Sequence, residues 1–127
     1  MKKYSLTIML FFTSMVNADV PSESQHEVQH LISFVRNTSC QIDRNWTNHN
    51  GLEAIAHIQQ KYAYYKDDIS TTEQFIEYSA SKSTMTGMDY LVKCADQSPV
   101  KTRGWLLQEL QRYRAQRKSK LDVKEKL

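Results

Sequence analysis

Three side chains that can bind metal ions recur at intervals of four residues: His49, Glu53 and His57. On a single helix they would share one face, and two imidazoles with a carboxylate are ligands that zinc accepts. The spacing differs, however, from the HExxH pattern of zinc proteases. Asn50 is also a good helix N-cap with Glu53 at the capping-box position, which leaves His49 outside the helix. We therefore favour surface histidines and a capping glutamate, and expect no bound metal and no cofactor.

A hydroxyl-rich segment after Ala80 is the second group that could do chemistry. It contains Ser81, Ser83, Thr84 and Thr86. A serine nucleophile needs an oriented base, and this segment has neither the GxSxG nor the SxxK pattern. With only three glycines in the chain, there is also no phosphate-binding glycine loop. A small hydrolase or metal-dependent enzyme is thus the alternative function, and a non-enzymatic binding or interaction domain is the favoured one.

A hypothesis about binding combines Arg44, which is a cation, with this hydroxyl-rich segment, which we expect to form a turn. Cys40–Trp46 and Asp89–Cys94 are typical of short strands, and if they pair, Arg44 and the hydroxyl-rich turn lie near the same end of the pair. A guanidinium suits carboxylate or phosphate, and hydroxyls complete the hydrogen bonds of an anion. In the structural alternative, Arg44 pairs with Glu73 or Asp43 and the hydroxyls finish the helix. The candidate binding residues are Arg44, His49, Ser81, Ser83, Thr84 and Thr86.

The N-terminus has the parts of a secretory signal peptide. Residues 1–3 are basic, residues 4–16 are mostly apolar, and Val16-Asn17-Ala18 places small residues where signal peptidase cuts. The apolar run is short for spanning a bilayer, which takes about 20 residues. We expect cleavage after Ala18, with an uncleaved anchor as the alternative.

The two cysteines, Cys40 and Cys94, both follow this segment. An even number of cysteines in an exported chain argues for a disulfide. Such a bond would tie the two expected strands together. Two free thiols are the alternative, and no CxxC or Cys/His spacing supports a metal pair.

Positive charge gathers at the C-terminal end, where residues 112–126 include seven basic and two acidic side chains. A polybasic segment can bind anionic lipid or nucleic acid, and export makes nucleic acid an unsuitable partner. A membrane-surface protein held weakly by this end is therefore a third hypothesis. The favoured interpretation is one domain over residues 19–118 followed by a disordered basic tail over residues 119–127.

Apolar residues at helical spacing predict four helices, over about residues 24–36, 50–66 and 70–80 and from residue 102 onward. Ser24, Asn50 and Ser70 are the expected caps, each followed three residues later by glutamate. With the two strands, the expected fold is α+β and mostly helical. Its order is α-β-α-α-β-α, with a two-stranded antiparallel pair.

Two stretches carry a more specific pattern. Arg44 to Lys61 reads RNxxxHxxxEAxxHxxxK, and Ile69 to Val92 contains IxTxExFI, then ASxS, a glycine and YxV. Together they resemble the YfeK-like family of small, exported bacterial proteins of unknown function, over about residues 28–114. The family often has glycine at the position of Trp46. The resemblance implies a periplasmic location and carries no known activity, cofactor or catalytic residue, so the partner expected is an unknown periplasmic protein or a small anionic ligand.

Overall fold

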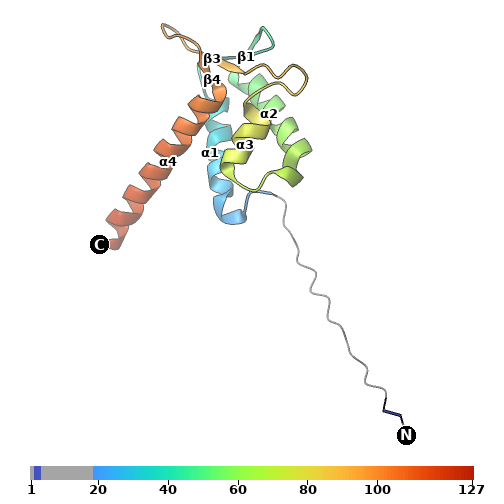
Figure 1. Cartoon of the computed structure of the whole chain (residues 1–127). Coiled ribbons are helices and arrows are strands. Elements are labelled where there is room, and N and C mark those ends of the chain that lie inside the picture. The colour runs from blue at the N-terminus through green and yellow to red at the C-terminus, as the bar shows by residue number, and fades with distance from the viewer. Residues whose placement is uncertain (1, 4–18) are drawn as a thin grey trace.

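Four α-helices and a four-stranded sheet organise the chain in the computed structural model, which describes residues 2–3 and 19–127 (Figure 1). The predicted signal peptide, residues 1–18, lies outside the described residues except for Lys2 and Lys3. In the described part of the chain, no helix is both long and apolar enough to cross a membrane. The elements are η1 (Ser22–Ser24), α1 (Gln25–Arg36), β1 (Gln41–Arg44), β2 (Thr47–His49), α2 (Gly51–Tyr65), η2 (Lys66–Asp68), α3 (Thr72–Ala80), β3 (Leu91–Lys93), β4 (Val100–Lys101) and α4 (Thr102–Glu125).

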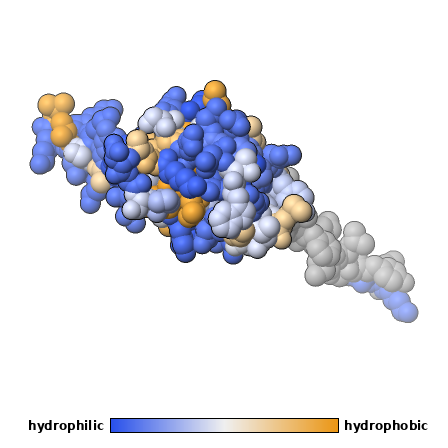
Figure 2. Space-filling view, turned by 90° about the horizontal axis from the view of Figure 1, so that it is seen from above, coloured by the Kyte–Doolittle hydropathy of each residue, from blue (hydrophilic) through white to orange (hydrophobic). Residues whose placement is uncertain are grey.

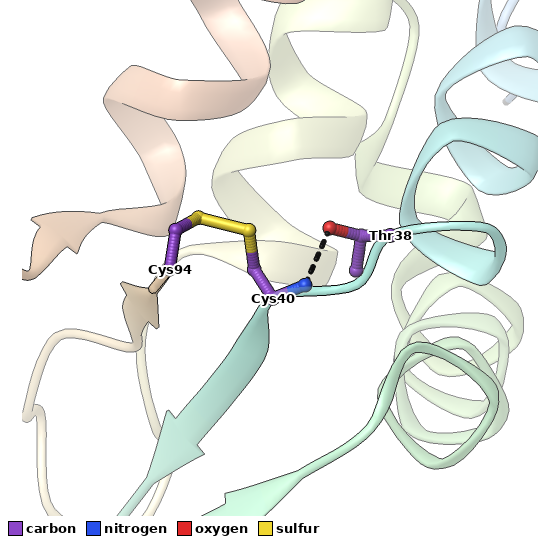
Figure 3. The surroundings of a disulfide bond; sticks show 3 residues. All are labelled: Thr38, Cys40 and Cys94. Carbon is purple, nitrogen blue, oxygen red and sulfur yellow. Dashed lines mark hydrogen bonds between the residues drawn. A yellow bond between two sulfur atoms is a disulfide. The ribbon is translucent and has the colours of Figure 1, made fainter. Parts of the chain in front are cut away.

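The sheet has the order β2-β1-β3-β4, and all of its neighbouring strands are antiparallel. Ile42 in the middle of β1 lies opposite Val92 of β3, which confirms the predicted pairing of these two segments. Cys40 and Cys94 extend the pair and form the predicted disulfide, with their Cα atoms 4.4 Å apart. Figure 3 shows this bond beside Thr38, whose hydroxyl oxygen accepts a hydrogen bond from the Cys40 amide.

The α+β, mostly helical class is confirmed, but the expected order lacks two strands. β2 is polar and largely exposed, so it shows no alternation of apolar and polar residues. β4 has only two residues, both exposed. Neither strand buries a side chain, and for that reason neither has the pattern by which a strand is recognised in a sequence.

The core lies between the helices, with the sheet at one end of them (Figure 1). Its largest fully buried side chains include Leu31 of α1, Phe75 of α3 and Leu106 of α4. At the edge of the core Phe34 of α1 packs against Trp105 of α4, with the centres of the two tilted rings 4.6 Å apart. α2 begins so close to the end of α1 that a Cβ on Gly51 would lie 2.3 Å from the Val35 carbonyl oxygen. Glycine is therefore required where α2 begins.

The predicted helix caps are only partly found. Asn50 and Glu53 form the expected capping box at the start of α2. The cap predicted at Ser70 is one residue early, because Thr71 is the N-cap of α3 and its hydroxyl accepts from the Gln74 amide. Two neighbouring hydroxyl residues have almost the same capping propensity, so the choice between them depends on how α3 packs.

Glu27 has a different role from the predicted one. Ser24 is the N-cap of α1 but makes no side-chain cap, and Glu27 is buried instead of reaching back to it. Its carboxylate accepts hydrogen bonds from Thr72 and from Arg114. Arg114 also pairs with Glu73. This group therefore joins α1, α3 and α4 through side chains that are far apart in the sequence.

The C-terminal end also differs from expectation. We expected a domain ending at residue 118 and a disordered tail over residues 119–127, whereas α4 continues as a helix to Glu125. Every residue from 114 to 127 is exposed, and α4 extends away from the other helices in Figure 1. A helix that has already begun inside the domain adds further residues at little cost, even where they bury nothing.

Candidate functional site

The pleat of β1 directs Arg44 toward α2. Side chains two residues apart on a strand share a face, and Ile42, two residues before Arg44, is buried in the core. Continuing the β1–β3 register by one residue places Arg44 beside Tyr90. From α2, His57 and Lys61 lie one turn apart on the helix, and burial together with the positive charge of Arg44 lowers the pKa of both. The end of the sheet and the middle of α2 therefore form one site, which we call the Arg44 cluster: Arg44, His57, Lys61 and Tyr90.

The Arg44 guanidinium has no partner for two of its nitrogen atoms. Nε and Nη1 are both buried, and neither makes a hydrogen bond within the described residues. The two ion pairs considered as the structural alternative do not form. The Asp43 carboxylate lies 2.8 Å from Lys93 Nζ, and Glu73 is paired with Arg114.

Lys61 is a second buried cation, with an exposed fraction of 9%. Its ammonium group donates a hydrogen bond of 2.7 Å to the Lys82 carbonyl oxygen and lies 5.2 Å from the centre of the Tyr90 ring. Burial, and then the charge of Arg44, lower the pKa of Lys61. The ammonium has three N–H donors, and only one of them has an acceptor among the described residues.

His57 lies near both cations, with Nε2 3.2 Å from the Tyr90 hydroxyl. Burial and the positive charges of Arg44, Lys61 and His49 lower the pKa of His57 from 6.5 to about 4. The imidazole is therefore neutral at pH 7. Burial raises the pKa of Tyr90, so that its phenol is protonated there as well.

The hydroxyl-rich turn is fastened to the β1–β2 hairpin through Asn45, the residue after Arg44. The Asn45 amide nitrogen donates to Ser83 Oγ at 3.2 Å, and its oxygen accepts from Thr86 Oγ1 at 2.8 Å. Ser83 Oγ also accepts from the Thr86 amide at 3.3 Å. A hydroxyl oxygen has two lone pairs and one proton. With both lone pairs used, the Ser83 proton is left without an acceptor among the described residues.

The other predicted residues have different roles. Ser81 is buried and donates to the Ile76 carbonyl oxygen, so it finishes α3. Thr84 Oγ1 lies 3.1 Å from the Tyr65 hydroxyl at the rim of the site. His49 is close enough for its charge to act on His57, but its Nδ1 faces Glu53 at 3.4 Å. No three His, Cys, Asp or Glu side chains are placed to hold a metal ion in the chain from residue 19 onward or at residues 2–3.

A cleft of about 520 Å³ opens beside the Arg44 cluster. Lys61 and Ser83 lie in its wall, so these two residues of the site face the cleft, whereas Arg44 is not one of its lining residues. Its lining residues are Lys61, Tyr65, Glu77, Tyr78, Lys82, Ser83, Thr84 and Gly87.

The sequence argument included Arg44 and the turn but missed Lys61 and Tyr90 as members of the site. A lysine in an amphipathic helix is normally placed on the solvent side. The available signal was the spacing of His57 and Lys61, which are four residues apart and so share a face. Tyr90 alternates with Val92, and the two together indicate the buried face of β3.

The whole site lies within residues 22–114, which match the model of a family of unknown function, DUF5329. A 47-residue segment is 43% identical to "Uncharacterized protein YfeK" of Salmonella typhimurium. That match covers 37% of this chain and 39% of the relative, so it spans well under half of either protein. No solved structure is significantly similar to the chain. Because the family model covers nearly all of the folded domain, the chain belongs to the YfeK-like family of unknown function, DUF5329.

Proposed function

We propose that this protein is an exported, non-enzymatic binding domain that holds a small anion, or the anionic group of a partner, at Arg44, Lys61 and Ser83. The observation that carries the proposal is the half-buried Arg44, whose guanidinium atoms Nε and Nη1 are shielded from solvent and have no acceptor among the described residues. Shielding part of a charged group from water without giving it a partner costs free energy. A bound anion would offset that cost.

The composition of the site supports an anionic ligand. Donors are in excess, because Arg44, Lys61 and Ser83 all have N–H or O–H groups without acceptors. The nearby carboxylates are paired elsewhere, Glu77 with Arg103 and Asp89 with Lys101. A carboxylate or phosphate accepts several hydrogen bonds at once and matches such a group of donors.

A catalytic role is less well supported by the same contacts. A serine or threonine nucleophile needs a base in hydrogen-bond contact. The Ser83 hydroxyl contacts Asn45 and the Thr86 amide, and Thr84 contacts the Tyr65 hydroxyl. None of these groups is a base at neutral pH, and the neighbouring imidazole of His57 is occupied by Tyr90. The hydroxyls therefore suit binding better than acyl transfer.

Export is supported by the N-terminal sequence and by the Cys40–Cys94 disulfide, a bond typical of oxidising compartments such as the periplasm. The intact mass of the protein recovered from expressing cells tests this part. We expect a chain that begins at Asp19. A mass that still includes residues 1–18 contradicts the cleavage.

Anion binding is tested by thermal unfolding in acetate or phosphate against chloride at equal ionic strength. A ligand that binds only the folded state raises the melting temperature. We expect the wild type to be stabilised by one of the two anions and Arg44→Gln not to be. Arg36→Gln is the matched control, because Arg36 is an exposed arginine at the end of α1. Equal stabilisation of all three proteins would indicate a general salt effect and contradict the proposal.

A further inference from the structure

The cleft beside the Arg44 cluster is much larger than a bare anion requires. Its volume of about 520 Å³ lies within the range of pockets that hold whole small molecules. Lys61 and Ser83, which belong to the anion site, form one part of its wall. The anion would therefore be one end of a larger molecule whose remainder lies in the cleft.

The wall of the cleft is aromatic and polar. Tyr65 and Tyr78 supply two rings with centres 5.5 Å apart, and the other side chains are charged or hydroxyl-bearing apart from one glycine. No aliphatic side chain lies among these lining residues, whereas pockets for apolar ligands are mostly aliphatic and aromatic. An aromatic face carries partial negative charge and attracts the polarised C–H groups of a sugar ring. Hydroxyl groups of the same ring can bond to Lys82 and Thr84.

The charges along the cleft also give the ligand a direction. Lys61 stands at the inner end, near Arg44. Glu77 also lines the cleft, but its carboxylate is paired with Arg103, so it does not exclude a second carboxylate of the ligand. We infer that the ligand is a carboxylated sugar of the uronic acid type, an inference that rests on the proposed function. Its carboxylate contacts Lys61 and is attracted by the neighbouring charge of Arg44, and its ring lies against Tyr65 and Tyr78.

An acidic peptide fits this cleft less well. A peptide held in an extended form takes most of its affinity from main-chain hydrogen bonds to a free strand edge. The backbone beside the cleft is already used, since the Lys82 carbonyl accepts from Lys61 and Lys82 forms a β-bridge with Asp89. The surface seen in Figure 2 is also largely hydrophilic, with only small, separate hydrophobic areas.

Calorimetric titration with four probes tests the inference: acetate, digalacturonate, the neutral disaccharide galactobiose, and an N-acetylated Asp-Glu dipeptide. We expect digalacturonate to bind at least tenfold more tightly than acetate. A tenfold gain in affinity is about what one or two sugar rings stacked on tyrosine would contribute. Galactobiose should bind far more weakly, because it has no carboxylate for Lys61 and Arg44. The dipeptide should bind no more tightly than acetate.

Two tyrosine variants locate the sugar. Tyr78→Ala should weaken digalacturonate binding by about tenfold and leave acetate binding unchanged. Tyr64→Ala is the matched control, because Tyr64 is 81% exposed and does not line the cleft. If Tyr78→Ala unfolds, Tyr78→Leu retains a larger apolar side chain than alanine and still removes the aromatic face.

The possible failures can be told apart. If acetate binds in an Arg44-dependent way and digalacturonate binds no more tightly, the sugar inference is wrong and the proposed function stands. Tighter binding of the dipeptide than of digalacturonate would replace the sugar with a peptide. Unchanged digalacturonate affinity in the Tyr78 variants would place the ring outside the cleft. If no probe depends on Arg44, the proposed function fails together with the inference.

Discussion

Arg44 is the residue whose surroundings least resemble those of an ordinary structural side chain. Most buried arginines are held by carboxylates, but here the adjacent Asp43 serves Lys93 instead. Arg44 also lies close to Lys61, whose pKa its charge lowers. Without a ligand, the two cations repel each other inside the fold.

Replacing Arg44 with glutamine should therefore leave the free energy of unfolding unchanged, or raise it by about 1 kcal/mol, when no anion is present. Glutamine is neutral, so the substitution removes the positive charge that repels the Lys61 ammonium. Urea unfolding in chloride buffer measures the effect. Asp43→Asn is the contrasting variant and should be less stable, because it leaves the Lys93 ammonium without its partner. A loss of more than about 1 kcal/mol in Arg44→Gln would mean that the arginine has a structural role.

His57 should make stability depend on pH. Its pKa is about 4 in the folded protein and 6.5 in the unfolded chain, so the unfolded chain binds the proton more readily between these values. The contribution is complete above about pH 6.5 and is lost as the pH falls toward 4. We expect it to be about 1–2 kcal/mol, since partial contact with solvent weakens the effect.

Urea unfolding of the wild type and of His57→Gln at pH 7 and pH 4.5 measures this contribution. The loss of stability between the two pH values should be smaller in the variant, because glutamine does not titrate. The same loss in both proteins would show that other groups cause the acid sensitivity.

At this scale the sequence indicated Arg44 but not the reason why it matters. Its type and its place near a strand end suggested a binding role. That its partners are absent depends on where the carboxylates of Asp43, Glu73 and Glu77 point, and a sequence does not contain that information. Lys61 was missed for a related reason, because burial of a lysine follows from the packing of the sheet end on α2.

Among the elements, the β1–β2 hairpin has an unusual turn. Asn45 and Trp46 both have positive φ angles, 50° and 70°, as the two central residues of a type I′ turn require. Glycine is favoured at the second of these positions, and an L-residue with a side chain is strained there. Trp46 is nevertheless 83% exposed, so packing does not compensate for the strain.

Trp46→Gly should raise the free energy of unfolding by about 0.5–1 kcal/mol, after the greater chain entropy of glycine is taken into account. Trp46→Ala keeps the strained backbone angle and should give no such gain. Urea unfolding of both variants decides the matter. Equal stability of the glycine and alanine variants would show that the turn is not strained by its side chain.

The disulfide holds the β1–β3 pair where it meets the helices. The bond closes a loop over a sequence separation of 54 residues, and a loop of this size is worth about 4 kcal/mol in the chain-entropy model. A Cys40→Ser/Cys94→Ser double variant should lose up to that amount in urea unfolding. Reductant should destabilise the wild type similarly and leave the double variant unaffected. If reductant leaves the wild type unchanged, the bond contributes nothing to stability.

The paired strands β1 and β3 were predictable because Ile42, Tyr90 and Val92 are apolar residues among polar neighbours, and each strand adjoins a cysteine. β2 and β4 were not predictable, because they add hydrogen bonds without burying side chains. The site depends on both kinds of strand, since the β1–β2 hairpin places Asn45 against the hydroxyl-rich turn. Its shape could therefore be predicted only in part.

For the molecule as a whole, the Glu27–Arg114–Glu73 group marks where α4 stops contributing to the fold. Arg114 is the last residue of α4 that pairs with another helix. The hydrogen bonds that Arg114 donates to Glu27 lower the pKa of this buried carboxyl. Glu27 and Arg114 are 87 positions apart in the sequence, and a contact of that range could not be predicted from local pattern.

Deleting residues 118–127 should change the free energy of unfolding by less than about 0.5 kcal/mol, because the deleted part is exposed throughout. Arg114→Met in the full chain should cost about 3 kcal/mol, since it leaves Glu27 buried without its cation. Urea unfolding compares the two. A large loss on truncation would show that the end of α4 packs against the domain.

The same truncation tests the hypothesis of membrane contact. If the basic end of α4 holds the protein at a membrane surface, the full chain should bind anionic vesicles in a salt-sensitive way and the truncated chain should not.

The positions of the two tryptophans give the protein a built-in optical reporter. Trp46 is in water at the hairpin tip, whereas Trp105 packs against Phe34, so their indole rings should emit at longer and shorter wavelengths respectively. Trp46 follows Asn45, whose side chain is hydrogen-bonded to Ser83. A molecule that contacts Ser83 would therefore disturb the surroundings of the Trp46 ring. In a Trp105→Phe variant all tryptophan fluorescence comes from the hairpin, and emission from the protein alone can then follow occupancy of the cleft without any attached dye.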